Sequence, residues 1–168
     1  IEVLLLSDRI DEWLVSNLTE FEGKPLASVA RGELDLGPEA EEEKKAQEAA
    51  SEANKGLVEK LKAALGERVK DVRVTTRLTE SPSCLVADQH DMGANLARIL
   101  KAAGQKVDLF KPILEVNPEH AIVKRLNPLD ERFDDWAHLL YDQALLAEGG
   151  QLEDPAAFVK RLNSLTLA

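Results

Sequence analysis

Cysteine is almost absent from this chain of 168 residues, which has only Cys84, so no disulfide can form within it. It also has no apolar run long enough to cross a bilayer. Its apolar opening, IEVLLL, lacks the positively charged segment that precedes the core of a signal peptide. These absences favour a reducing, cytoplasmic location. Because the chain opens on Ile1 rather than Met, we expect it to be part of a longer polypeptide.

Concentrated positive charge is also missing. The 21 Lys and Arg are outnumbered by 31 Asp and Glu, which gives a net charge of -10, and the basic residues form no run. Nucleic-acid binding requires a basic surface that neutralises phosphates, so we expect no nucleic-acid partner. An anionic membrane surface is disfavoured for the same reason, and we expect no membrane partner.

The usual motifs for catalysis and metal binding are absent as well. His90, His120 and His138 show neither zinc-site spacing nor a neighbouring cysteine pair. Asp88, His90 and Asp91 could form a weak metal site, but carboxylates at a helix start are better explained as caps and dipole partners. The sequence has no glycine-rich phosphate loop and no nucleophile elbow. We therefore expect no catalytic, cofactor-binding or metal-binding residue in this chain.

Residues 1–30 hold too few elements for a core of their own. The apolar residues 2–6 predict a short buried strand, and Ser7 or Asp8 would cap the helix that follows. Residues 26–30 could form another short strand. A strand, a helix and half a strand cannot make an independent core, so we expect this stretch to be the remnant of a preceding domain.

Helix and strand patterns then alternate along the chain. Residues 39–65 predict one long helix whose acidic residues come first, as the helix dipole favours. Residues 72–78 alternate apolar and polar side chains, and with the apolar run 84–87 they predict a β-hairpin. A helix over residues 88–103 and a third strand over 112–116 follow.

The end of the chain carries the strongest pattern, two apolar helices joined by a tight break. The first helix is apolar around most of its circumference, Gly149-Gly150 ends it, and Asp154-Pro155 starts the second. Two such helices cannot hide all this apolar surface from each other, so a second copy would complete a four-helix bundle. The alternative is that the helical hairpin packs only on its own domain. The expected dimer interface is Trp136, Leu139, Leu140, Ala144, Phe158, Leu162 and Leu165.

The predicted fold class is α+β. It combines a long helix, a small three-stranded antiparallel sheet with an inserted amphipathic helix, and then three helices. The first of these three starts at Asn117-Pro118, and the last two form the dimerising hairpin.

The inserted helix has one apolar face, formed by Met92, Leu96, Ile99 and Leu100. Judged by spacing alone, such a face is more often part of a core than a binding surface. If it were exposed, a surface of Met, Leu and Ile would suit adaptable contact with varied apolar partners.

Long segments of the chain resemble the ninety-kilodalton heat-shock chaperones, and the bacterial HtpG type most of all. The similarity extends over nearly the whole chain and is weakest at residues 31–56. The segments that carry it are LLLSDRIDEW (4–13), GERVKDVRVTTRLTESPSCLV (66–86), LEVNPEHAIVKRL (114–126) and LLYDQALLAEGGQLEDPAAFVKRLNSL (139–165).

The resemblance implies a division of the chain and a role for each part. Residues 1–30 would finish the middle domain, 31–66 would be a linker and connecting helix, and 67–168 would be the C-terminal dimerisation domain. The family's ATP and Mg site lies in its N-terminal domain, and none of its motifs occurs here. The implied role is therefore that of a homodimerisation and client-contacting domain, without the ATPase site, of a stress-response chaperone.

The resemblance also implies which residues touch partly unfolded client proteins. These are Trp13, Met92, Leu96, Ile99 and Leu100. The chain ends Leu165-Thr166-Leu167-Ala168, without the acidic tail that recruits tetratricopeptide co-chaperones in eukaryotic members, so we expect no docking by that route. The alternatives are a non-chaperone scaffold and a fragment of a multidomain enzyme.

Overall fold

The computed structural model describes residues 2–6, 8, 10–29, 40–87 and 111–167. Contacts divide the chain into two units, which are described separately. One unit comprises residues 1–34 and 87–110, and the other comprises residues 35–86 and 111–168. Among the described residues, no helix is both long and apolar enough to cross a membrane.

Among its described residues, the first unit has the helix α1 (Asp11–Asn17) and a small hairpin of β1 (Glu20–Phe21) and β2 (Lys24–Pro25). Glu22 and Gly23 both have positive φ angles, 51° and 75°, which matches the tight turn that the twist of two antiparallel strands favours.

The strands predicted at residues 2–6 and 26–30 are wrong, because the described parts of both stretches contain no strand. An extended apolar run becomes a strand only where a neighbouring strand pairs with its backbone N–H and C=O groups. The apolar pattern of residues 2–6 carries no information on whether such a strand lies beside it.

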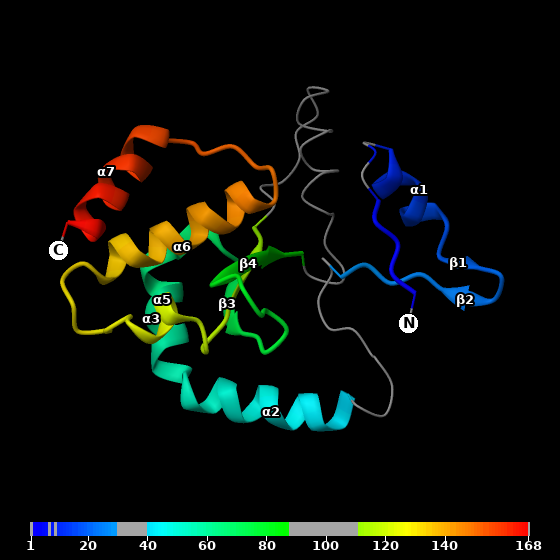
Figure 1. Ribbon diagram of the computed structural model, residues 1–168, viewed down its shortest axis with the longest axis horizontal. Helices are drawn as coiled ribbons and strands as arrows, with labels where there is room; N and C mark the ends of the chain where they lie inside the picture. Colours follow the sequence, from blue (N-terminus) through cyan, green and yellow to red (C-terminus); the bar gives the residue numbers. More distant parts are fainter. Residues whose placement is uncertain (1, 7, 9, 30–39, 88–110, 168) are drawn as a thin grey trace. The chain divides into compact units, whose positions relative to one another are not determined.

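The long helix predicted over residues 39–65 is two helices, α2 (Ala40–Ala53) and α3 (Lys55–Leu65), which Figure 1 shows at an angle to one another. The break falls at Asn54, whose side-chain Nδ2 donates to the carbonyl oxygen of Ala50 at 2.8 Å. Short amide side chains compete in this way with the helix backbone.

The sheet of the second unit has three strands, β3 (Asp71–Val74), β4 (Ser83–Val86) and β5 (Ile113–Val116). Their order is β3-β5-β4, so the last strand in sequence lies at the centre, parallel to β3 and antiparallel to β4. The predicted antiparallel sheet and the predicted β3–β4 hairpin are therefore wrong. All four residues of β5 are buried, as expected of a central strand covered on both faces.

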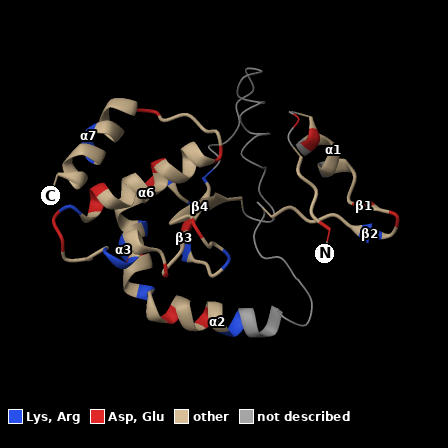
Figure 2. Ribbon diagram, viewed as in Figure 1, with Lys and Arg blue, Asp and Glu red and all other residues tan. Residues whose placement is uncertain are grey.

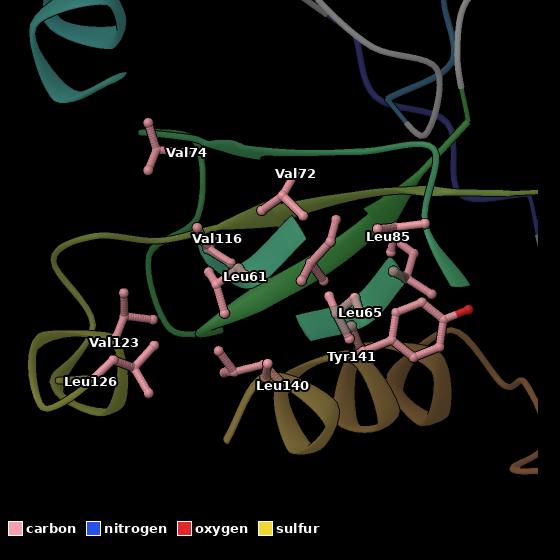
Figure 3. Close-up of a cluster of buried hydrophobic side chains, with 14 of the residues drawn as sticks. Leu61, Leu65, Val72, Val74, Leu85, Val116, Val123, Leu126, Leu140 and Tyr141 are labelled. Atoms are coloured by element: carbon pink, nitrogen blue, oxygen red, sulfur yellow. The ribbon is translucent and has the colours of Figure 1, made fainter. Parts of the chain in front are cut away.

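The core of the second unit lies where α3 and α6 (Phe133–Ala147) pack against the sheet (Figure 3). The register aligns Val72 and Leu85 with Leu114 across the sheet, and all three are buried. Leu61 of α3 and Leu140 of α6 are fully covered within the same cluster. Burial of each such side chain stabilises the fold by about 1.5–3 kcal/mol.

The helices α5 (Ala121–Lys124) and α7 (Pro155–Thr166) complete this unit. The helix predicted from Pro118 begins at Ala121 as α5, where His120 Nδ1 accepts from the backbone N–H of Ile122 at 3.1 Å. The chain then passes through α6 to α7. The α+β class is confirmed.

Candidate functional site

The pair α6 and α7 forms the C-terminal hairpin, and the two helices contact each other (Figure 1). The break between the two helices lies where the sequence predicts it, while α6 begins at Phe133, three residues after the predicted start at Asp130. Gly149 adopts a φ of 73° after α6, and the backbone N–H of Gly150 donates to Leu145 O at 2.9 Å. A side chain at Gly150 would collide with that of Leu145. The Asp154 carboxylate caps α7 by accepting from the N–H of Ala157 at 2.9 Å.

The residues expected at a dimer interface fall into two groups. Leu139, Leu140, Ala144 and Leu165 are buried within this one chain. Trp136, Phe158 and Leu162 are only partly covered. The first group is thus explained by packing on its own domain, the alternative that the sequence left open, while the second group still has surface to offer.

The predicted dimer interface left out two apolar side chains of the hairpin that are more exposed than Trp136, Phe158 and Leu162. Val159 is 50% exposed and Leu146 is 43% exposed. Their position at the edge of the apolar stripe of each helix was the sequence feature that could have indicated this exposure. We define the hairpin surface as five of the large apolar side chains of the two helices that keep exposed area. It consists of Trp136, Leu146, Phe158, Val159 and Leu162.

A buried carboxylate joins α6 to its surroundings. The side chain of Asp142 is only 5% exposed, and its Oδ1 lies 2.5 Å from Arg68 Nη2. Its other oxygen, Oδ2, lies 3.4 Å from Nη1 of Arg161 on α7. Sequence reasoning missed this residue, although a charged residue within an apolar stretch of helix was the available signal.

Two further residues of α6 belong to the same network. Arg161 Nε lies 3.6 Å from Asp135 Oδ1, and Arg68 Nη1 lies 2.8 Å from His138 Nδ1. We call Arg68, Asp135, His138, Asp142 and Arg161 the α6–α7 clasp. Figure 2 shows its setting, with acidic positions along α6 and basic positions on α7.

The charges of the clasp balance when His138 is neutral. An arginine can only donate, so Nδ1 of His138 accepts and the ring carries its proton on Nε2. Burial lowers the pKa of His138, and the nearby charges of Arg161 and Arg68 lower it further. Two positive and two negative side chains then remain. The Arg68 guanidinium also lies 4.1 Å above the ring of Tyr141, which covers it on one side.

A second buried carboxylate lies on the side of the sheet away from the core. Glu115 of β5 has a side chain that is 3% exposed, and it pairs with Arg73 and Arg77. Cys84 Sγ lies 3.7 Å from Glu115 Oε2. Burial raises the pKa of Cys84 to about 12, and the negative charge of Glu115 contributes to this rise. The thiol is therefore not a nucleophile at neutral pH.

The remaining predicted site residues are placed only in part. Trp13 lies on α1 and is 62% exposed. Met92, Leu96, Ile99 and Leu100 lie outside the described residues, as do Asp88, His90 and Asp91. Within the part of the chain that the structure describes, no group of three His, Cys, Asp or Glu side chains could hold a metal ion.

Comparison with known proteins identifies the family. Residues 1–167 match the family model of the Hsp90 protein. The chain is 67% identical over 168 residues to the chaperone protein HtpG of Burkholderia ambifaria and to that of Burkholderia cenocepacia, and it covers 27% of each. It is equally similar, at 67%, to HtpG of Paraburkholderia xenovorans, of which it covers 26%.

All of this chain is aligned in those matches, yet it spans only about a quarter of the length of the curated relatives. The chain belongs to the Hsp90 protein family.

Proposed function

We propose that this chain is the homodimerisation and client-contacting part of a cytoplasmic, ATP-dependent chaperone that binds partly unfolded proteins. Membership of the Hsp90 family and the similarity to the chaperone protein HtpG support this proposal. The observation that carries the dimerisation half is the hairpin surface, because its five apolar side chains remain partly or largely exposed on two packed helices.

The size of this surface is sufficient for self-association. A two-fold interface uses each residue twice, so five side chains from each copy contribute ten. Complete burial of a large apolar side chain stabilises by about 1.5–3 kcal/mol; Val159 and Leu146 have roughly half of that still to gain, and the three partly covered residues have about a third at most. Association costs about 4–15 kcal/mol, so the ten together can offset it while one or two could not.

The test replaces Val159 by Asp, because this residue contributes exposed surface rather than core. The matched control is Ser164→Asp, which adds the same charge to an exposed polar position of the same helix. Sedimentation across a range of concentrations should show a dimer for the parent chain and for the control. Val159→Asp should raise the dissociation constant by about a hundredfold, as expected when about 2.7 kcal/mol is lost. An unchanged dimer would place the interface elsewhere.

Client contact is proposed for Trp13 and for the apolar face of residues 88–103. The exposure of Trp13 supports it, because a large indole left open to water can bury apolar surface of a partner. Replacing Met92, Leu96 and Leu100 by Ser should weaken binding of a reduced, carboxymethylated model protein. Circular dichroism and the dimer mass should stay unchanged. Loss of helical signal would assign these residues to the core instead.

We further propose that ATP and Mg are bound by a part of the polypeptide outside this chain. Titration calorimetry of the chain with MgATP should give no saturable heat. Saturable binding would support the alternative of an enzyme fragment. A chain that stays monomeric and binds a polycation in a salt-sensitive manner would support the alternative of a scaffold.

A further inference from the structure

We propose that the α6–α7 clasp sets the rotation of α7 about its own axis, and so determines which of its apolar side chains face a second copy of the chain. Asp142 and Arg161 would be the positioning residues. This inference rests on the self-association proposed above and names what controls it.

Apolar packing alone holds α7 weakly. Of its side chains, all of which the structure describes, only Leu165 is buried. Phe158 and Leu162 lie on the same side of the helix but are only partly covered, so apolar contact defines the rotation of α7 loosely. A second, directional contact is needed to select one rotation.

Arg161 supplies that contact from one turn earlier in the helix. Its guanidinium reaches Asp142 at 3.4 Å and Asp135 at 3.6 Å, so two carboxylates about two turns apart on α6 share one planar fork. A lysine could not occupy both positions in this way, because its charge is a single point.

The direction fixed by Arg161 determines the outward face of α7. Successive residues of an α-helix are about 100° apart, so Val159 points about 160° away from Arg161 and Leu162 about 100° away. The observed burial agrees with this geometry. Arg161 and Leu162 are partly covered, while Val159 is 50% exposed.

The buried end of the clasp explains why its geometry is specific. Asp142 already has Arg68 on one oxygen, and Arg161 takes the other. If α7 rotated, this oxygen would lose its partner in a nearly water-free site, and such an unpaired group is costly. Other rotations of α7 are therefore energetically unfavourable.

The experiment uses three variants of α7, Arg161→Gln, Arg161→Lys and the control Lys160→Gln. The control removes the same charge from the neighbouring exposed residue, for which no ion pair is found among the described residues. Hydrogen exchange of α7 amides reports docking within one chain, and sedimentation reports the dimer. Arg161→Gln should raise both the exchange rate and the dissociation constant by about tenfold or more. Arg161→Lys should raise both by less, and Lys160→Gln should change neither.

Disulfide trapping between copies reads out rotation directly. A cysteine at Val159 should cross-link two copies, and one at Ser164 should not, because it lies about 140° around the helix. Native Cys84 will not compete, since its thiol is mostly buried and its pKa is raised to about 12. In an Arg161→Gln background, cross-linking should spread to position 164.

The outcomes separate the two proposals. A parent chain that is monomeric at every concentration overturns self-association, and α7 exchange alone then decides whether the clasp positions the helix. A dimer whose exchange, dissociation constant and cross-linking pattern are all unchanged by Arg161→Gln overturns the clasp while leaving self-association intact.

Discussion

Replacing Glu115 by Gln tests whether a buried ion cluster stabilises the sheet of the second unit. Glu115 lies at the centre of the sheet, and its side chain is almost fully covered. Oε1 lies 2.8 Å from Arg73 Nε and 2.6 Å from Arg73 Nη2, while Oε2 pairs with Arg77. Glutamine keeps the shape but presents an amide donor to one of the two guanidinium groups.

The magnitude follows from the exposure of the partners. Breaking a fully buried pair costs about 3–5 kcal/mol, because the remaining charge is left without compensation. The side chains of Arg73 and Arg77 are 32% and 35% exposed, so water will solvate part of the charge that is left. We therefore expect a loss of about 2–3 kcal/mol in the free energy of unfolding.

The matched control is Glu119→Gln, which removes the partner of Lys124. In that pair both side chains are largely exposed, so the loss should be about 0–1 kcal/mol. Urea unfolding of both variants, followed by circular dichroism, gives the comparison, and the dependence on denaturant should be unchanged. If the Glu115 variant loses no more stability than the control, the cluster does not stabilise the sheet.

Three further predictions concern the hairpin and the sheet. The pKa of His138 is lowered from 6.5 in the folded chain, so folding disfavours protonation of its ring. The neutral ring should therefore make its full contribution to stability above pH 6.5, and this contribution should decline as the pH falls below 6.5. Urea unfolding between about pH 7 and pH 5 should show this loss, and His138→Gln should reduce the slope. Leu140→Ala should cost about 2–5 kcal/mol, because it empties a site in the core, and Leu162→Ala clearly less; thermal unfolding of both variants would show equal losses if Leu140 were not core. Cys84 should react with a thiol reagent at neutral pH only as fast as the sheet opens, so a rapid reaction in the native chain would contradict its burial and raised pKa.

Local signals in the sequence predicted the hairpin well. The ends of α6 and α7 follow from Gly149-Gly150 and from Asp154-Pro155, since a cap or a break depends only on nearby backbone. The sheet topology was not predictable in this way. Strand pairing joins distant residues, and nothing in the pattern of residues 72–87 revealed that β5 would pair with both strands and separate them.

The candidate site was predictable only in part, for a related reason. Periodicity identified the apolar stripe of α6, but it could not distinguish the buried residues of that stripe from the partly exposed ones. Leu140 and Ala144 are buried within the chain, whereas Trp136 is only partly covered. That division depends on where α3 and the sheet lie. Asp142 was missed because its partners, Arg68 and Arg161, are 74 and 19 residues away in sequence.

The two helices of the hairpin are held by different forces, and this difference bears on how a dimer of this chain would respond to its surroundings. α6 is anchored by apolar burial, which salt hardly weakens. α7 has one buried leucine and an arginine whose charge is partly open to water, so its position depends more on electrostatics. Raising the ionic strength should therefore loosen α7 before α6. Amide exchange measured along both helices at two salt concentrations would show α7 alone accelerating, and equal acceleration of α6 would contradict this assignment of forces.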